Sequence, residues 1–167
     1  MADQNDVPAT GDKKTAQFAL QRIYVKDISF EAPGTPAAFA VEWKPETKVQ
    51  FTTGAQRIEG NLFEVILTIN VLATNGEKAA FIVEVKQAGL FLIDVPENSL
   101  EQVLGTHCPS ILFPYARETI SDLVSRGTFP QLLLQPMNFD AIYADATRRR
   151  QEAKVAAAQE GAVAAKH

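Results

Sequence analysis

Residues 109–140 read PSILFPYARETISDLVSRGTFPQLLLQPMNFD and join a predicted amphipathic helix to an irregular, leucine-rich crossover. We expect the helix to begin near Pro109, because a proline costs no hydrogen bond in the first turn, and to end at Gly127. Apolar side chains recur at helical spacing along one side, and together they are wide enough to cover a β-sheet. These side chains are Leu112, Ala116, Ile120, Leu123 and Val124.

The crossover that follows this helix carries more apolar material than a surface connection usually does. A second irregular segment, AAFAVEW at residues 37–43, is similarly apolar and comes just after two prolines. Such side chains either cap the core or line a groove, and capping is the commoner outcome on physical grounds. A groove would bind extended apolar peptides with little sequence selectivity, because buried area rather than directed hydrogen bonds would supply the affinity. The candidate groove residues are Phe39, Trp43, Leu132, Leu133, Leu134 and Met137.

Two extended segments, residues 62–73 and 78–87, predict a β-hairpin with an Asn-Gly turn signal between them. Large apolar residues occupy odd-numbered positions in both segments. We expect a three-residue loop that ends at a left-handed Gly76 and pairs Ile69 with Phe81, because this register places both apolar stripes on one buried face. The opposite face is expected to meet solvent or a partner, and it carries Glu64, Thr68, Asn70, Ile82, Glu84 and Lys86.

Further strands and a last helix are predicted on either side of this hairpin. The first apolar segment changes parity between Val25 and Ile28, which predicts a bulge there. A second extended run covers residues 44–53, and another bulge is expected at Ala88-Gly89. The last helix is expected to open at Asn138, a favourable N-cap.

The chain has 167 residues, of which 46% are hydrophobic, and this is enough for one well-packed core. We expect residues 1–15 to form a flexible N-terminal arm, 16–147 a single folded domain and 148–167 a basic, alanine-rich tail. The polar start lacks the apolar run of a signal peptide, and no uninterrupted apolar segment is long enough to span a bilayer. A single cysteine fits a reducing compartment. These features favour a cytoplasmic protein.

Charge and motif spacing disfavour several classes of function. Residues 1–147 carry 11 basic and 18 acidic side chains, so the body repels phosphate backbones and nucleic acid is not an expected partner. His107 and Cys108 are adjacent and cannot readily point at one reacting atom. With His167 they also lack the number and spacing of zinc ligands, and no phosphate-binding glycine motif occurs. We therefore expect no catalytic group, no metal and no cofactor.

Four blocks of the sequence resemble the SecB family of protein-export chaperones. The resemblance spans roughly residues 18–143, which is nearly all of the predicted domain. Blocks of this length are far more specific than a short motif. They are QRIYVKDISFEAP at 21–33, FPYARE at 113–118, SRGTFPQL at 125–132 and NFDA at 138–141.

The resemblance implies both a fold and a function. The fold is an α+β domain, a four-stranded antiparallel sheet with helices packed on one face, assembled as a homotetramer that is a dimer of dimers. Chaperones of this family hold precursor proteins unfolded in the cytosol and pass them to the SecA export motor without ATP or insertion into the membrane. Family residues that dock SecA align with Asp27, Glu31, Ile82 and Glu84.

The resemblance also implies roles for residues on the other side of the same strand. Positions that affect tetramer formation align with Val83, Val85 and Gln87, which we expect to be core or interface residues. The Arg- and Ala-rich tail departs from the usual acidic tail of the family, so whether the tail contacts SecA is left open by the resemblance.

Two rival functions remain open at this point. One is a SecB-like chaperone dedicated to an antitoxin, which would share the same physics with a narrower client. The other, less favoured, is a small-molecule carrier or enzyme that uses the apolar groove as a pocket. Strong preference for one protein partner would support the first, and a tightly copurifying small ligand would support the second.

Overall fold

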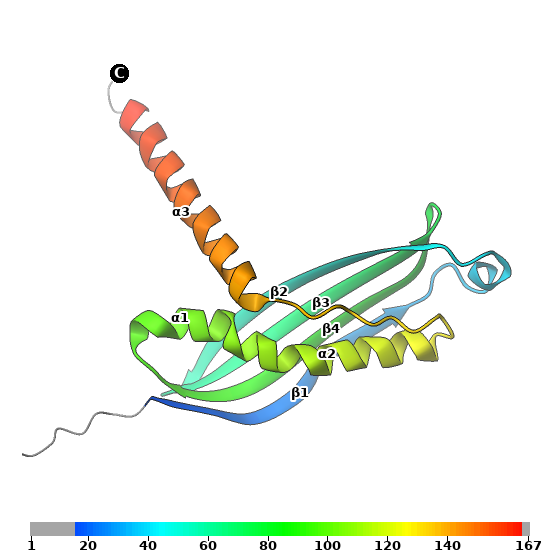
Figure 1. Ribbon diagram of the computed structural model, residues 1–167, viewed down its shortest axis with the longest axis horizontal. Coiled ribbons are helices and arrows are strands. Elements are labelled where there is room, and N and C mark those ends of the chain that lie inside the picture. Colours follow the sequence, from blue (N-terminus) through cyan, green and yellow to red (C-terminus); the bar gives the residue numbers. More distant parts are fainter. Residues whose placement is uncertain (1–15, 165–167) are drawn as a thin grey trace, which may run out of the picture.

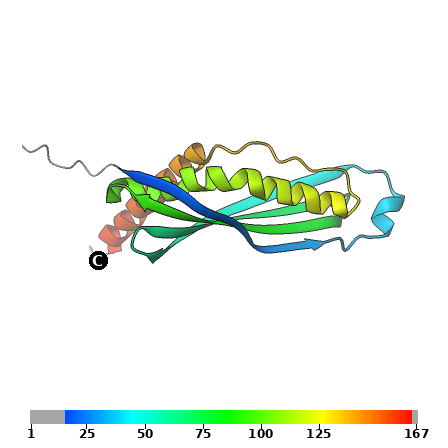
Figure 2. The same ribbon diagram turned by 90° about the horizontal axis from the view of Figure 1, so that it is seen from below.

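The structure, a computed structural model, describes residues 16–164 and contains one antiparallel sheet in the order β1-β4-β3-β2. Helices α1 and α2 cover one face of this sheet, and α3 extends from its β2 side (Figures 1 and 2). The predicted α+β fold is therefore confirmed, while the predicted arm at residues 1–15 lies outside the described residues. The elements are β1 Gln17–Glu31, the 3-10 helix η1 Ala37–Ala40, β2 Pro45–Glu59, β3 Leu62–Asn75, β4 Lys78–Asp94, α1 Glu97–Gly105, α2 His107–Arg126 and α3 Phe139–Ala164.

The core lies between α2 and the odd-numbered side chains of β3 and β4. Val65, Leu67, Ile69, Val83 and Val85 are all 0% exposed, which confirms the predicted buried face. We call this helix-covered side of the sheet the inner face and the opposite side the outer face. Large aliphatic side chains packed at this density supply most of the free energy that stabilises such a domain.

The register of the β3–β4 hairpin differs from the prediction by four residues. Ile69 pairs with Val85 rather than with Phe81. The turn is a tight one over Gly76 and Glu77, and Gly76 has the expected positive φ of 64°. Such a turn alone would pair odd with even positions, but the register shifts by one residue just beyond it, where Ala80 is the extra residue. Beyond the bulge, odd-numbered residues of β3 pair with odd-numbered residues of β4, which is the pairing that a three-residue loop was expected to produce.

One predicted bulge is confirmed and the other is wrong. The register of β1 against β4 shifts between Val25 and Asp27, as the change of parity indicated. Pairing continues without a shift through Ala88 and Gly89. Gly89 has a different role, because a Cβ there would lie 2.7 Å from the Phe91 ring and 3.0 Å from a methyl of Leu112. It is a close-packing site under α2.

Helix α2 begins at His107, two residues earlier than predicted, and ends at Arg126 immediately before Gly127. Pro109 thus lies inside the first turn, where its missing N–H costs nothing. The predicted apolar side of the helix is confirmed: Leu112, Ala116, Ile120 and Val124 are 0% exposed, and Leu123 is partly buried against the core.

Helix α3 opens where the sequence predicted. The Asn138 side chain accepts a hydrogen bond from the backbone N–H of Ala141 at 3.0 Å, which confirms the N-cap. Phe139 is buried, whereas residues 147–158 are all exposed. The helix continues through the predicted boundary at residue 148 and projects away from the sheet (Figure 1).

Candidate functional site

The crossover, residues 128–138, runs back beside α2 over the part of the sheet that β2 and β3 form (Figures 1 and 2). Its apolar side chains divide into two kinds. Leu134 is 8% exposed and belongs to the core, so it caps the sheet. Leu133 is 62% exposed, and Leu132 and Met137 pack partly buried against the core. The crossover therefore both caps the core and presents apolar side chains outward, because alternate side chains point to opposite sides.

An aromatic cluster links the crossover to the loop around η1. Phe129 and Phe81 are buried, with ring centroids 5.0 Å apart. Trp43 lies over both of them, 5.4 Å from Phe129 and 6.4 Å from Phe81. Phe39 sits 5.2 Å from Phe129 and is 52% exposed. The buried rings of Phe81 and Phe129 thus support the exposed ring of Phe39. An apolar segment of another protein could bind on this surface.

We call the exposed and half-buried residues of these two segments the crossover surface. It comprises five of the six predicted groove residues. Phe39 and Trp43 contact the crossover at Phe129, whereas Leu133 lies further along it, in a hollow beside Arg117 and Asp122 of α2. Because the two segments are about 90 residues apart in sequence, no local pattern predicted that they would meet. The crossover surface consists of Phe39, Trp43, Leu132, Leu133 and Met137.

The four residues that the resemblance aligned with SecA docking lie side by side on the outer face. Glu31 of β1 pairs directly with Ile82 of β4, and Glu84 is two residues further along β4. Asp27 pairs with Lys86, so it lies one strand away from Glu84. The side chains of Asp27 and Glu84 are 58% and 33% exposed, and Ile82 is 37% exposed. We call Asp27, Glu31, Ile82 and Glu84 the outer patch.

A lysine lies inside this otherwise acidic patch. The Nζ of Lys86 is 3.3 Å from Oδ2 of Asp27 and 3.2 Å from Oε1 of Glu84. These hydrogen bonds, first to Glu84 and then to Asp27, raise the pKa of Lys86 above its ordinary value. The sequence placed Lys86 on this face but gave it no role, because the pairing that sets it between two carboxylates depends on the β1–β4 register.

Glu64 departs most from its predicted environment. It lies on the outer face as expected, yet it is only 4% exposed. The Nζ of Lys26 is 2.8 Å from both of its carboxylate oxygens, and Nε2 of Gln56 is 2.7 Å from Oε2. The Tyr24 hydroxyl also donates to the carboxylate. Four side chains from three strands therefore form one hydrogen-bonded cluster.

Strand order explains why the sequence did not predict this cluster. Tyr24 and Lys26 belong to β1 and Glu64 to β3, with β4 between them. The bonds must pass over β4, where Ala88 pairs with Tyr24 on one side and Ile66 on the other. A methyl group at this position leaves room for the crossing side chains and is itself fully buried.

The cluster shifts the pKa values of two of its members. Hydrogen bonds from Lys26 and then from Tyr24 hold the pKa of Glu64 below its ordinary value. Burial, aided by the bond to Glu64, raises the pKa of Tyr24 to about 12. At neutral pH Glu64 is therefore a carboxylate and Tyr24 a neutral phenol, and the carboxylate accepts hydrogen bonds from Tyr24, Lys26 and Gln56.

Val83, Val85 and Gln87, the positions aligned with tetramer formation, all lie in the core on the inner face of β4. Gln87 is 2% exposed, and its Nε2 donates to the backbone carbonyl of Tyr24 at 2.9 Å. Its Oε1 has no hydrogen-bond partner in the described part of the chain. In a single chain these residues therefore pack the helix layer against the sheet.

Cys108 and His107 do not form a reactive pair. Cys108 is 0% exposed, and burial raises the pKa of its thiol to about 12. His107 is exposed, with its ring centroid 4.7 Å from that of Phe18. Within residues 16–164 no group of three His, Cys, Asp or Glu side chains is placed to hold a metal ion. None of the helices described is both long and apolar enough to cross a bilayer.

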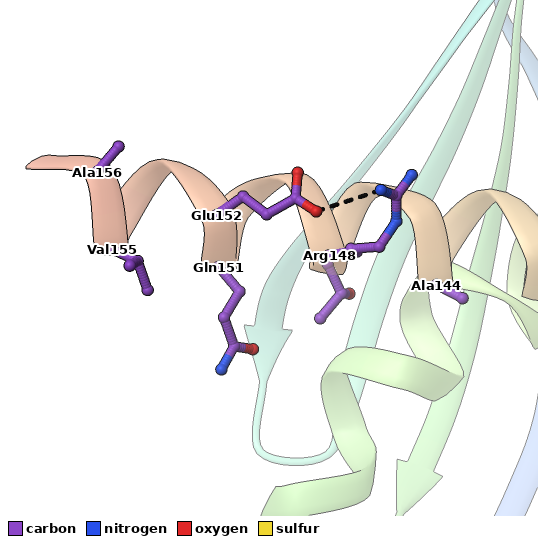
Figure 3. A pocket seen from close by; sticks show the side chains of 7 residues that line it. Ala144, Arg148, Gln151, Glu152, Val155 and Ala156 are labelled. Atoms are coloured by element: carbon purple, nitrogen blue, oxygen red, sulfur yellow. Dashed lines mark hydrogen bonds and ion pairs between the residues drawn. The ribbon is translucent and has the colours of Figure 1, made fainter.

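A hollow on α3 is lined by that helix alone (Figure 3). Arg148 and Glu152, one turn apart, form an ion pair at 3.2 Å along its side. A lining drawn from one helix encloses nothing, so this hollow is not a candidate site.

The fold and these surfaces define a helix-covered α+β protein whose candidate sites are open faces rather than enclosed cavities. The model of the family described as preprotein translocase subunit SecB matches residues 11–150. The chain therefore belongs to the SecB family of protein-export chaperones, and the resemblance stated from the sequence is confirmed.

Curated relatives agree over nearly their whole length. The chain is 50% identical over 153 residues to a protein-export protein SecB of Pseudomonas fluorescens, covering 91% of this chain and 95% of that one. It is 48% identical over 161 residues to a protein-export protein SecB of Marinobacter nauticus, covering 96% and 98%.

A solved structure shares the fold at low sequence identity. It is a SecB-like chaperone of Mycobacterium tuberculosis in complex with a peptide from an antitoxin, with a TM-score of 0.61 and 18% identity. The match covers 72% of this chain and 91% of that chain.

Proposed function

We propose that this protein is a cytosolic holding chaperone that keeps precursor proteins unfolded without ATP and delivers them to the SecA motor. The observation that carries the proposal is the crossover surface, where Phe39 is 52% exposed beside the buried Phe129 ring and Leu133 is 62% exposed further along the crossover. Membership of the SecB family supports it. A native protein hides its apolar segments, whereas an unfolded precursor presents them, so such a surface selects for the unfolded state.

Client binding by this surface would depend on area. Burial of apolar surface contributes roughly 25 cal/mol per Å², whatever the order of the side chains buried. Met137 and the leucines of the crossover can adjust their rotamers to different clients. Low sequence selectivity follows, as a chaperone with many precursors requires.

We also propose that four copies assemble as a dimer of dimers, so that several weak sites act on one client. Strand β1 is an edge strand, and three of its apolar side chains, Leu20, Val25 and Ile28, are 39%, 46% and 45% exposed. An exposed apolar edge favours pairing with a second copy. Linked sites then raise avidity by roughly 10² to 10⁴ through effective concentration.

The outer patch is our proposed SecA-docking surface. Its carboxylates suit a basic partner surface, and exposed Ile82 can supply apolar contact beside Glu31. It lies on the face opposite the helix layer and the crossover, so a bound client and a bound motor need not compete.

A refolding assay tests the holding function. Purified protein should delay the refolding of a chemically unfolded precursor and leave the native precursor unaffected. The variant Phe39→Ser/Leu133→Ser should delay refolding less than wild type. Val155→Ser is a matched control, because Val155 is 53% exposed on the projecting part of α3. Identical refolding curves with and without the protein would contradict the chaperone proposal. If the protein delayed the folding of one antitoxin and of no precursor, a chaperone dedicated to that antitoxin would be the better description.

Motor docking and assembly need separate measurements. Asp27→Lys/Glu84→Lys should weaken SecA binding by calorimetry while client holding persists. Asp122→Lys serves as the control for charge reversal, since Asp122 is an exposed carboxylate on α2. Equal SecA affinity for wild type and the double variant would contradict the docking assignment. Light scattering should give the mass of four chains, and a monomer mass would contradict the assembly.

A further inference from the structure

Lys86 lies at the Asp27 end of the outer patch and contacts two of the carboxylates that a basic partner would need. Its Nζ lies 3.3 Å from Asp27 and 3.2 Å from Glu84. Among the described residues, no other cation forms an ion pair with either of them. The patch as folded therefore already contains a bound cation, supplied by the chain itself.

Lys26, the other lysine on this part of the outer face, is held in a different way. Both oxygens of Glu64 lie 2.8 Å from its Nζ, and the Glu64 side chain is only 6% exposed. Its partner is thus a buried carboxylate that no docking protein can reach. Release of Lys26 would leave a buried charge without its counter-ion, which is costly. Lys26 stays in place when a partner arrives.

Lys86 is free to move, by contrast. Its side chain is 38% exposed and its partners are 58% and 33% exposed, so solvent can replace each of its bonds. Exposed ion pairs of this kind are individually weak. The flexible lysine stem can carry the ammonium group away from the patch and leave Asp27 and Glu84 open.

We propose that Lys86 is an internal competitor of the basic partner, and that it weakens docking on the outer patch. The inference rests on the proposed docking function and deepens it. Docking exchanges one ammonium group on Asp27 and Glu84 for the cations of the partner, so affinity is lower than the carboxylates alone would give. Such an exchange favours partners that present several cations together, because a single lysine offers no more than Lys86 already supplies.

The test compares Lys86→Gln with Lys78→Gln by calorimetry with SecA at about 0.1 M salt. Both changes remove one positive charge from strand β4. Lys78 lies eight positions away, roughly 26 Å along the strand, well beyond the Debye length of about 10 Å. We expect Lys86→Gln to bind SecA about fivefold more tightly than wild type, and Lys78→Gln to bind within about twofold of it. Equal affinities for the two variants would overturn the inference, and so would weaker binding by Lys86→Gln.

A second probe separates this inference from the docking proposal. A hexalysine peptide has the chemistry of a basic surface and needs no motor, and it should bind Lys86→Gln more tightly than Lys78→Gln. If no variant bound SecA, the docking proposal would fail, and the peptide ranking would still decide whether Lys86 competes with external cations. Client holding should be the same for both variants, because neither lysine belongs to the crossover surface.

Discussion

The two faces of the sheet use the same four strands in opposite ways. On the inner face, Val83 and its aliphatic neighbours are fully buried. Close packing of these side chains holds α2 against the sheet. On the outer face, polar side chains form a buried ionic cluster at Glu64 and a half-exposed one at Lys86. The inner face therefore tolerates little change, whereas the half-exposed part of the outer face around Lys86 can vary its charges without loss of the fold.

Two glutamates on the outer face sharpen this comparison. Glu64 is 4% exposed and bonded to three side chains, whereas the Glu84 side chain is 33% exposed and bonded to Lys86. Both occupy even-numbered positions of neighbouring strands. The difference is made by what lies beside them: residues that reach over Ala88 cover one carboxylate and leave the other open. The exposure of a side chain on a sheet face therefore depends on the side chains around it as well as on whether its position is odd or even.

The largest expected effect on stability is a difference between substitutions at two consecutive residues of β4, Val83 and Glu84. Val83→Asp would place an unpaired charge in a fully buried site, and we expect it to destabilise the fold by more than about 4 kcal/mol. Glu84→Gln, one residue further and on the outer face, should stay within about 1 kcal/mol of wild type. Thermal unfolding followed by circular dichroism at fixed protein concentration measures both. Similar midpoints for the two variants would show that the faces are not distinct.

Gly89→Ala should destabilise by about 2 kcal/mol, because the new methyl would meet the Phe91 ring at 2.7 Å and Leu112 at 3.0 Å. Gly54→Ala in β2 is its matched control, since a Cβ at Gly54 meets nothing within 4 Å. The same unfolding measurement applies. A midpoint for Gly89→Ala at or above that of Gly54→Ala would contradict close packing under α2.

Glu64→Gln should cost about 1 kcal/mol at pH 7, because it removes the charge that Lys26 and Tyr24 stabilise. The pH dependence of this stabilisation follows from the pKa of Glu64, which in the folded state lies below the ordinary 4.5. Wild type gains stability from Glu64 above the unfolded pKa and loses it as the pH falls through the lower folded pKa. The difference between wild type and Glu64→Gln should therefore shrink as the pH falls from about 5 towards 3.

The measurement is the unfolding midpoint of both proteins at each pH. Glu118→Gln, an exposed substitution on α2, controls for the general effect of acid. A difference between wild type and Glu64→Gln that widened in acid would contradict the ionic cluster.

The smallest expected effect on stability belongs to Ile82→Ser. Ile82 is 37% exposed, so its loss should change the unfolding free energy by no more than about 0.5 kcal/mol. On the proposed docking role, the same change should weaken SecA binding severalfold. A large loss of stability would place Ile82 with the inner face, and unchanged SecA binding would remove it from the outer patch.

Alternation and helical spacing predicted much of this fold. The buried face of the hairpin, the apolar side of α2, the Asn138 cap and the bulge after Val25 were all read correctly from the chain. The hairpin register and the role of Gly89 were not. Periodicity fixes which face a side chain occupies, but several registers share the same parity, and a bulge can replace a longer loop at little cost.

The sequence by itself determined the family, the layering of the fold and the membership of each sheet face, because these depend on repeated local patterns and on long matching blocks. Only the tertiary structure decided that Phe39 and Phe129 share an aromatic cluster, that Glu64 is buried on a polar face and that Lys86 lies between the carboxylates of Asp27 and Glu84. Each of these depends on contacts between segments distant in sequence. Strand order and register fix such contacts, and no local spacing encodes them.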